Sequence, residues 1–151
     1  MTKNTDPEWD ARVALSYERE ARIPILRDTP GDEARDELLA MLDDIDMMVV
    51  ERAATILAAR DVDSLDSLME IWDNTNDGTM RSGFMRNGIT QLGIDGAPLR
   101  EILDNRMKNG RPAVQRAAKS LMQVYGYLPY DTPTTQSKPS RPSSPSPQNP
   151  S

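Results

Sequence analysis

Residues 50–57 of this chain read VERAATIL, and a close copy of that segment, VQRAAKSL, occupies positions 114–121. Both copies carry valine first, arginine third, an alanine pair next and leucine last. Leu39, Ile71 and Leu103 follow one another at equal steps, each half of the distance between the two copies. A period of about 30–35 residues that contains two helices is typical of a helical solenoid. The repeat therefore predicts stacked helical pairs.

Apolar residues recur at the 3.6-residue period of an amphipathic helix on both sides of these segments, and strand patterning is nearly absent. We expect a first helix from Pro7, capped by Asp6, to about Arg22. Residues 23–26, IPIL, should interrupt that helix and pack as an extended strap, because the residue before proline avoids helical angles. Between residues 32 and 126 the pattern predicts six further helices.

VERAATIL and VQRAAKSL resemble the second helix of HEAT-like repeats, in which a valine, a basic residue and paired alanines precede a leucine. The resemblance covers about residues 32–126 and implies a short right-handed α-solenoid of about three helical pairs. The middle copy has Phe84-Met85 in place of the alanines and lacks the valine. A compact helical bundle therefore stays open as the alternative all-α fold.

These patterns divide the chain into three parts. Residues 1–31 are expected to form an N-terminal capping helix with its strap, and residues 32–126 the helical repeats. Residues 127–151 are rich in proline and serine and have no aliphatic residue after Leu128, so we expect a disordered tail.

Composition narrows the function classes. The chain has no cysteine and no histidine, which excludes thiolate and histidine metal sites and both Ser-His-Asp and Cys-His catalysis within it. We expect a non-enzymatic protein without catalytic, cofactor or metal residues. No apolar run approaches the roughly 20 residues that span a bilayer, so we expect no membrane partner and a cytoplasmic location.

One motif suggests a metal site. Residues 73–78, DNTNDG, begin like a calcium loop, with oxygen side chains at alternate positions and glycine sixth. The twelfth position, where such a loop needs a bidentate acid, is Phe84, and the ninth is Arg81. The segment therefore favours a polar turn between two helices.

Charge is distributed unevenly along the chain. Residues 1–77 hold 20 acidic and 8 basic side chains, whereas residues 78–126 hold 3 acidic and 8 basic ones. The candidate partner-binding residues come from both halves, and they are Asp43, Asp44, Asp46, Asp63, Asp66, Arg86, Arg116 and Lys119. Helix capping accounts for several of the acids, and Arg86 and Lys119 would form a basic column if the second helices of the repeats line one surface.

The resulting hypothesis is a protein–protein interaction module, either an adaptor or an immunity-like inhibitor, that binds a basic partner through an acidic helical surface. One alternative is a HEAT-like protein that binds nucleic acid or excises DNA bases through the basic face of residues 78–126. Another is a self-assembling structural protein in which the acidic half of one copy meets the basic half of the next.

Overall fold

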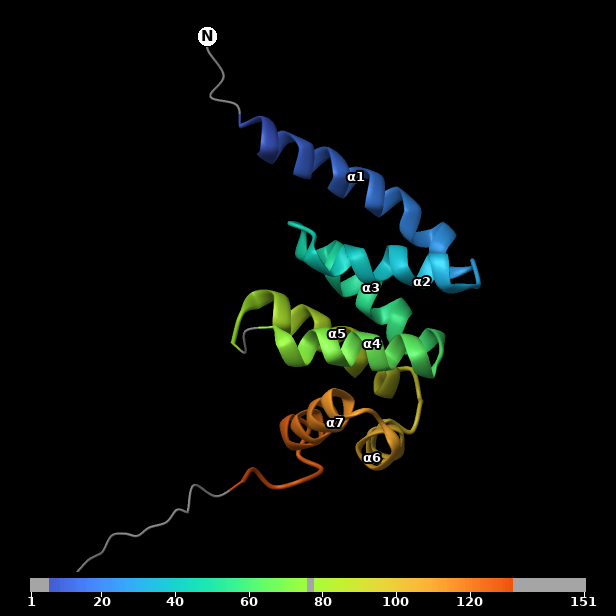
Figure 1. Ribbon diagram of the computed structural model, residues 1–151, viewed down its shortest axis with the longest axis vertical. Helices are drawn as coiled ribbons and strands as arrows, with labels where there is room; N and C mark the ends of the chain where they lie inside the picture. Colours follow the sequence, from blue (N-terminus) through green and yellow to red (C-terminus); the bar gives the residue numbers. More distant parts are fainter. Residues whose placement is uncertain (1–5, 76–77, 132–151) are drawn as a thin grey trace, which may run out of the picture.

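The computed structural model describes residues 6–75 and 78–131, and within them all regular structure is helical (Figure 1). The all-α prediction is therefore confirmed for this part of the chain. The elements are α1 (Pro7–Arg27), α2 (Asp32–Ala40), the 3₁₀ turn η1 (Met41–Asp43), α3 (Met47–Arg60), α4 (Val62–Asn74), α5 (Met80–Ile94), α6 (Leu99–Asn109) and α7 (Pro112–Val124).

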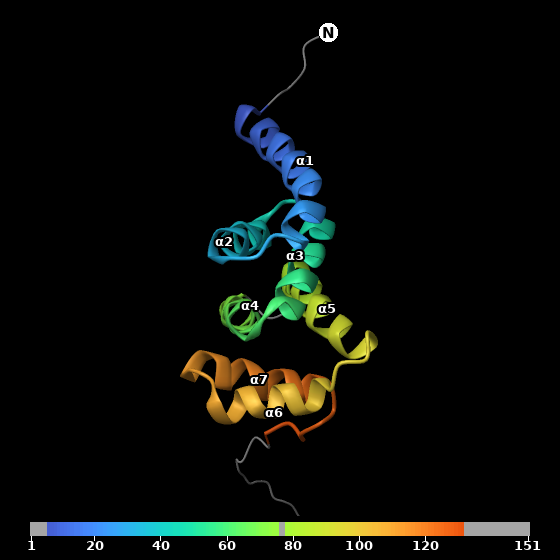
Figure 2. The ribbon, with the colours of Figure 1, turned by 90° about the vertical axis from the view of Figure 1, so that its right-hand side faces the viewer.

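The helices form two layers, which are seen edge-on in Figure 2. One layer contains α1, α3 and α5, and the other contains α2 and α4, with neighbours in each layer in contact, while α7 packs on α4 and lies across the end of the stack. α6 packs on α7 at the far end from α1. α7 packs chiefly against α6 and α4, and the chain reaches α5 through Tyr125, whose hydroxyl lies 2.8 Å from that of Thr90.

The closest helix contact in the first layer joins α3 and α5. Gly88 of α5 lies against the backbone of α3, where a Cβ added to it would come within 2.6 Å of the Ala54 carbonyl carbon and the Thr55 nitrogen. Val50, Ala53 and Leu57 of the same α3 are fully buried. The small residues at this contact thus let α3 and α5 approach closely.

Side-chain caps set several helix starts. Asp46 accepts a hydrogen bond from the Met48 N–H at 2.9 Å to begin α3, and Thr79 accepts one from the Ser82 N–H at 3.1 Å to begin α5. The cap of α4 is Asp61, which accepts the Ser64 N–H at 2.7 Å. Each such cap contributes about 1 kcal/mol.

The predicted strap over residues 23–26 is wrong, because α1 continues through Pro24 to Arg27. Proline in a helix interior costs about 3 kcal/mol, but Pro24 lies in the last turns, where Ile23 and Leu26 are both buried. Burying two such side chains contributes about 1.5–3 kcal/mol each. Helical packing of both therefore outweighs the preference of the residue before proline.

The chain beyond α7 folds back on the last helices. Tyr127 and Leu128, which the sequence assigns to the tail, pack against the core, and their N–H groups donate to the Met122 carbonyl at 2.7 and 3.2 Å. The Arg100 guanidinium lies 5.7 Å from the centre of the Tyr127 ring. The folded part thus extends past residue 126. The rest of the predicted tail, residues 132–151, and two residues of the DNTNDG segment, 76 and 77, lie outside the described residues.

The described residues contain neither a membrane-spanning helix nor a metal-binding cluster of side chains. None of their helices combines the length and the hydropathy needed to cross a membrane. Residues 6–75 and 78–131 also hold no cluster of three acidic side chains placed to bind a metal ion.

Candidate protein-binding surface

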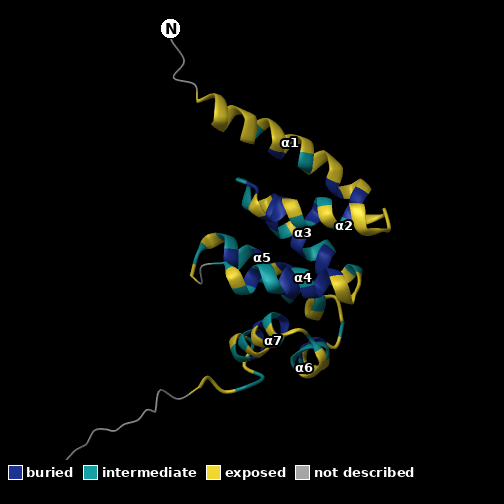
Figure 3. Ribbon diagram, in the orientation of Figure 1, coloured by how far each residue is buried: buried dark blue, intermediate teal, exposed yellow. Residues whose placement is uncertain are grey.

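The first helix is the least covered element of the fold. Figure 3 shows it exposed along most of its length, and its only buried residues are Ser16, Ile23 and Leu26. Four large apolar side chains of α1 are exposed instead, by 53%, 42%, 71% and 55% respectively: Trp9, Leu15, Tyr17 and Ile25. A helix that exposes this much apolar surface is a candidate for binding another protein.

Trp9 lies on the side of α1 that faces the body. It precedes Ser16 by seven residues and Ile23 by fourteen, so the three share one helix face. The first half of α1 projects past the other helices of its layer, as Figure 1 shows. Trp9 therefore continues the buried face of α1 beyond the point where the chain itself covers it.

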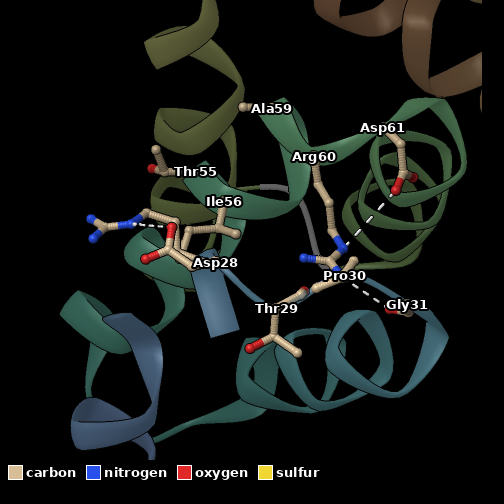
Figure 4. A pocket seen from close by; sticks show the side chains of 10 residues that line it. Asp28, Thr29, Pro30, Gly31, Thr55, Ile56, Ala59, Arg60 and Asp61 are labelled. Atoms are coloured by element: carbon tan, nitrogen blue, oxygen red, sulfur yellow. Dashed lines mark hydrogen bonds and ion pairs between the residues drawn. The ribbon is translucent and has the colours of Figure 1, made fainter. Parts of the chain in front are cut away.

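Arg60 holds the opposite end of α1. Its guanidinium, with the side chain 9% exposed, donates to the carbonyls of Thr29 at 2.6 Å, Gly31 at 2.9 Å and Leu26 at 3.4 Å (Figure 4). These contacts tie the end of α1 and the following loop to α3. A hollow of about 600 Å³ adjoins these Arg60 contacts and includes Asp61 in its wall. Because backbone carbonyls accept the hydrogen bonds of the Arg60 guanidinium, we assign Arg60 a structural role.

Asp44 joins three helices near the projecting half of α1. Its carboxylate accepts hydrogen bonds from Arg19 of α1 at 3.0 Å and from the Asp46 N–H at 2.9 Å, at the start of α3. Its carbonyl accepts from Arg81 of α5 at 2.8 Å. Burial raises the pKa of the Asp44 carboxyl, but the Asp46 N–H, the Ser16 hydroxyl and the Arg19 guanidinium together outweigh it and lower that pKa.

We expect this junction to make stability sensitive to acid. A carboxyl whose pKa is lower in the folded than in the unfolded chain, where it is about 3.9, stabilises the fold above that value. Its contribution is lost as the pH falls toward the lowered pKa. Asp44→Asn should therefore flatten the fall in free energy of unfolding between about pH 5 and pH 2. Urea titrations at several pH values measure this, and an unchanged slope would contradict it.

The predicted acidic residues have separate positions in the structure. Asp43 is exposed and pairs with Arg19 at 3.1 Å, whereas Asp46 caps α3. Asp63 is exposed in the first turn of α4. Asp66 is buried and binds Arg106 of α6 through two hydrogen bonds, at 2.8 and 2.7 Å. Asp44 and Asp66 are thus used inside the fold, which leaves Asp43 and Asp63 at the surface.

The predicted basic residues lie on two helices, α5 and α7. Arg116 pairs with Asp73 of α4 at 3.4 Å, and Lys119 pairs with Asp131 at 3.3 Å. Arg86 is half-buried on α5. A column of Arg86 and Lys119 requires α5 and α7 to pack along their lengths, but α7 packs on α4 instead.

An apolar groove of about 650 Å³ runs between α1 and α2. Leu15, Ala21 and Ile25 line it from α1, and Ala40 lines it from α2. The Arg22 guanidinium joins the two helices through hydrogen bonds of 2.8 Å to both carboxylate oxygens of Glu37, which lower the pKa of that carboxyl.

Sequence reasoning placed the binding surface on acidic residues and missed this groove. The available signal was the distribution of apolar residues in α1. Leu15 and Ile25 lie off the face defined by Trp9, Ser16 and Ile23, so the helix has more than one apolar side.

Comparisons with protein-family models, with curated proteins and with solved structures give no match for this chain.

Proposed function

We propose that this chain is a non-enzymatic protein-interaction module that binds a basic partner protein through α1 and the adjoining groove. The observation that carries the proposal is the exposed apolar surface of α1, with Trp9 and Tyr17 on the projecting half of the helix. Aromatic side chains are frequent energetic centres of protein interfaces, because they bury a large area at a small cost in conformational entropy.

Charge supports a basic partner. Residues 6–40, which form α1 and α2, contain ten acidic and five basic side chains. Among these acids, Asp10, Glu18 and Glu33 form no ion pair within residues 6–75 and 78–131. An acidic surface around an apolar one attracts a partner that carries Lys and Arg around its own apolar contact.

The paired arginines weigh against the nucleic-acid alternative. Arg106, Arg111 and Arg116 bind Asp66, Glu70 and Asp73 of α4 respectively. A guanidinium that already pairs with a carboxylate has less to gain from a phosphate. Three of the eight basic residues between 78 and 126 thus join α6 and α7 to α4.

Affinity capture with matched variants tests the proposal. The bait is the full chain, compared with Trp9→Ala/Tyr17→Ala and with the control Val62→Ala, which changes an equally exposed apolar residue on α4. We expect a captured protein to be lost with the double variant and kept with the control. After purification of that protein, its Kd for the double variant should be at least about tenfold higher, as expected for the loss of interface hot spots.

The salt dependence of binding tests the charge component separately. We expect the association rate constant to fall as salt rises from about 0.05 M to about 0.5 M, because screening weakens electrostatic steering. Circular dichroism under both conditions controls for the fold. A partner that binds equally well to all three baits, or whose association rate does not depend on salt, would contradict the corresponding part of the proposal.

A further inference from the structure

We infer that the groove between α1 and α2 binds an α-helix of the partner, with small and apolar residues on the face that enters it and Lys or Arg on both sides of that face. The inference rests on the proposed interaction function and specifies the structural element that the module recognises. A helix in this position would extend the layer of α2 and α4 by one member.

α1 stands one repeat step before α3 in the chain, with an alanine and an aliphatic residue at matching positions. The step that leads from Leu39 to Ile71 also leads from Glu18, Ala21 and Ile25 of α1 to Val50, Ala53 and Leu57 of α3. This correspondence agrees with the side-by-side contact between the two helices, since Glu20 of α1 binds Arg52 of α3, which stands one such step later. α1 therefore has the register of a repeat helix.

The equivalent residues differ in burial. Val50, Ala53 and Leu57 are fully buried in α3, which contacts both α2 and α4 of the other layer. Their α1 counterparts line the groove, and Ile25 is 55% exposed. Among the described residues, the contacts of α1 with that layer are chiefly with α2. Figure 2 shows that the layer of α2 and α4 ends at α2, beside the second half of α1. The groove thus corresponds to a helix position that none of the described residues fills.

The shape of the groove suits a helix. Two of its apolar wall residues are alanines, Ala21 on α1 and Ala40 on α2, and small side chains permit close contact between helix backbones. The same fold uses small residues this way at Ala54 and Gly88. Leu15 and Ile25 stand ten residues apart along α1, about 15 Å, or almost three turns of a docked helix.

The charged side chains that line the groove favour a basic helix as its ligand. Its two arginines are already bound, Arg19 to Asp43 and Asp44 and Arg22 to Glu37. Glu18 lines the groove without an ion pair in the described part of the chain, and Glu33 lies one turn before Glu37 on α2. A second copy of α1 would add its own acidic excess to this surface, so like-charge repulsion disfavours self-association here.

Two matched peptides test the inference. One is a helical peptide of about 18 residues, roughly 27 Å long, with leucine and alanine along one face and lysine on both sides of it. The other has glutamate in place of every lysine. Fluorescence anisotropy against the full chain measures each Kd. We expect the lysine peptide to bind at least about tenfold more tightly at low salt.

Variants locate the binding and reverse the charge preference. Ile25→Ser should raise the Kd of the lysine peptide at least about fivefold, whereas the control Val62→Ser, which alters an equally exposed aliphatic residue, should leave it within about twofold. Glu18→Lys should reduce the preference for the lysine peptide at least about tenfold, and Glu101→Lys, an exposed acid on α6, should not.

Each contrary outcome has a distinct meaning. Equal binding of both peptides, or equal effects of Ile25→Ser and Val62→Ser, overturns the groove inference. If partner capture still depends on Trp9 and Tyr17, the proposed function survives that failure. A chain that ends at Asp131 and binds the lysine peptide at least about tenfold more tightly would identify residues 132–151 as the occupant. A mass that doubles with protein concentration and returns to the monomer value in Ile25→Ser would identify a second copy.

Discussion

Replacing Asp66 with alanine is expected to lower the free energy of unfolding by about 3–5 kcal/mol, because it leaves a buried guanidinium without its counter-ion. The Asp66 side chain is 4% exposed and that of Arg106 is 13% exposed. Both carboxylate oxygens accept from the guanidinium, at 2.8 and 2.7 Å. This pair joins α4 to α6, so the loss should weaken the contact between the last helical pair and the rest of the fold. Urea denaturation measures the change.

Asp73→Ala is the matched control for this prediction. Asp73 also lies on α4 and also binds an arginine of the last helical pair, but its partner Arg116 is 63% exposed at 3.4 Å. Exposed pairs contribute less than about 1 kcal/mol. The double variant Asp66→Leu/Arg106→Met should recover much of the lost stability, since an apolar pair replaces a buried ion pair at little cost. Equal losses in Asp66→Ala and Asp73→Ala would contradict the role of burial.

The second large effect is expected from Gly88→Ala in the layer of α1, α3 and α5. The new Cβ would lie 2.6 Å from atoms of the α3 backbone, which cannot rotate away as a side chain does. α3 and α5 must therefore separate, and overpacking of this kind costs about 1–3 kcal/mol or more. Gly88→Ala should lower the midpoint of thermal unfolding by several degrees, at about 4 °C per kcal/mol, where the ranges for smaller and larger domains meet.

Gly83→Ala in the same helix gives the opposite expectation. An added Cβ there meets nothing within 4 Å, so the substitution should follow helix propensity, which favours alanine over glycine by about 1 kcal/mol. The midpoint should therefore rise in Gly83→Ala and fall in Gly88→Ala. A rise in both variants would show that α3 and α5 can separate without cost and that the close contact is dispensable.

Much of the helical architecture could be predicted from the sequence, because its causes are local. The 3.6-residue pattern, the Asp46 and Thr79 caps and the prolines at 98 and 112 all act within one or two turns. The exception was Pro24, where a local rule predicted an extended strap. There the outcome depended on burial of Ile23 and Leu26 by other helices, which periodicity within one segment does not report.

The candidate surface was less predictable because it depends on which helices meet. Asp66 and Arg106 are far apart in the chain, and their pairing follows from the position of α6 beside α4. The sequence therefore identified the charged residues but could not separate those used inside the fold from those left outside. The α1–α2 groove likewise requires two helices to be placed together. Whether the stack is a HEAT-like solenoid stays a prediction.

The helix α1 is held to the body at two places along its length, at the contacts of Asp44 and at those of Arg60. Arg19, which binds Asp44 and Asp43, lies ten residues after Trp9, about 15 Å along the helix. Arg60 fixes the C-terminal end of the helix through its hydrogen bonds to backbone carbonyls. A force applied at Trp9 is therefore expected to act on the contact between Arg19 and Asp44. The carbonyl of Asp44 in turn accepts a hydrogen bond from Arg81 of α5. A force on the tip of the first helix is thus expected to reach the start of the fifth through the contacts of this one aspartate.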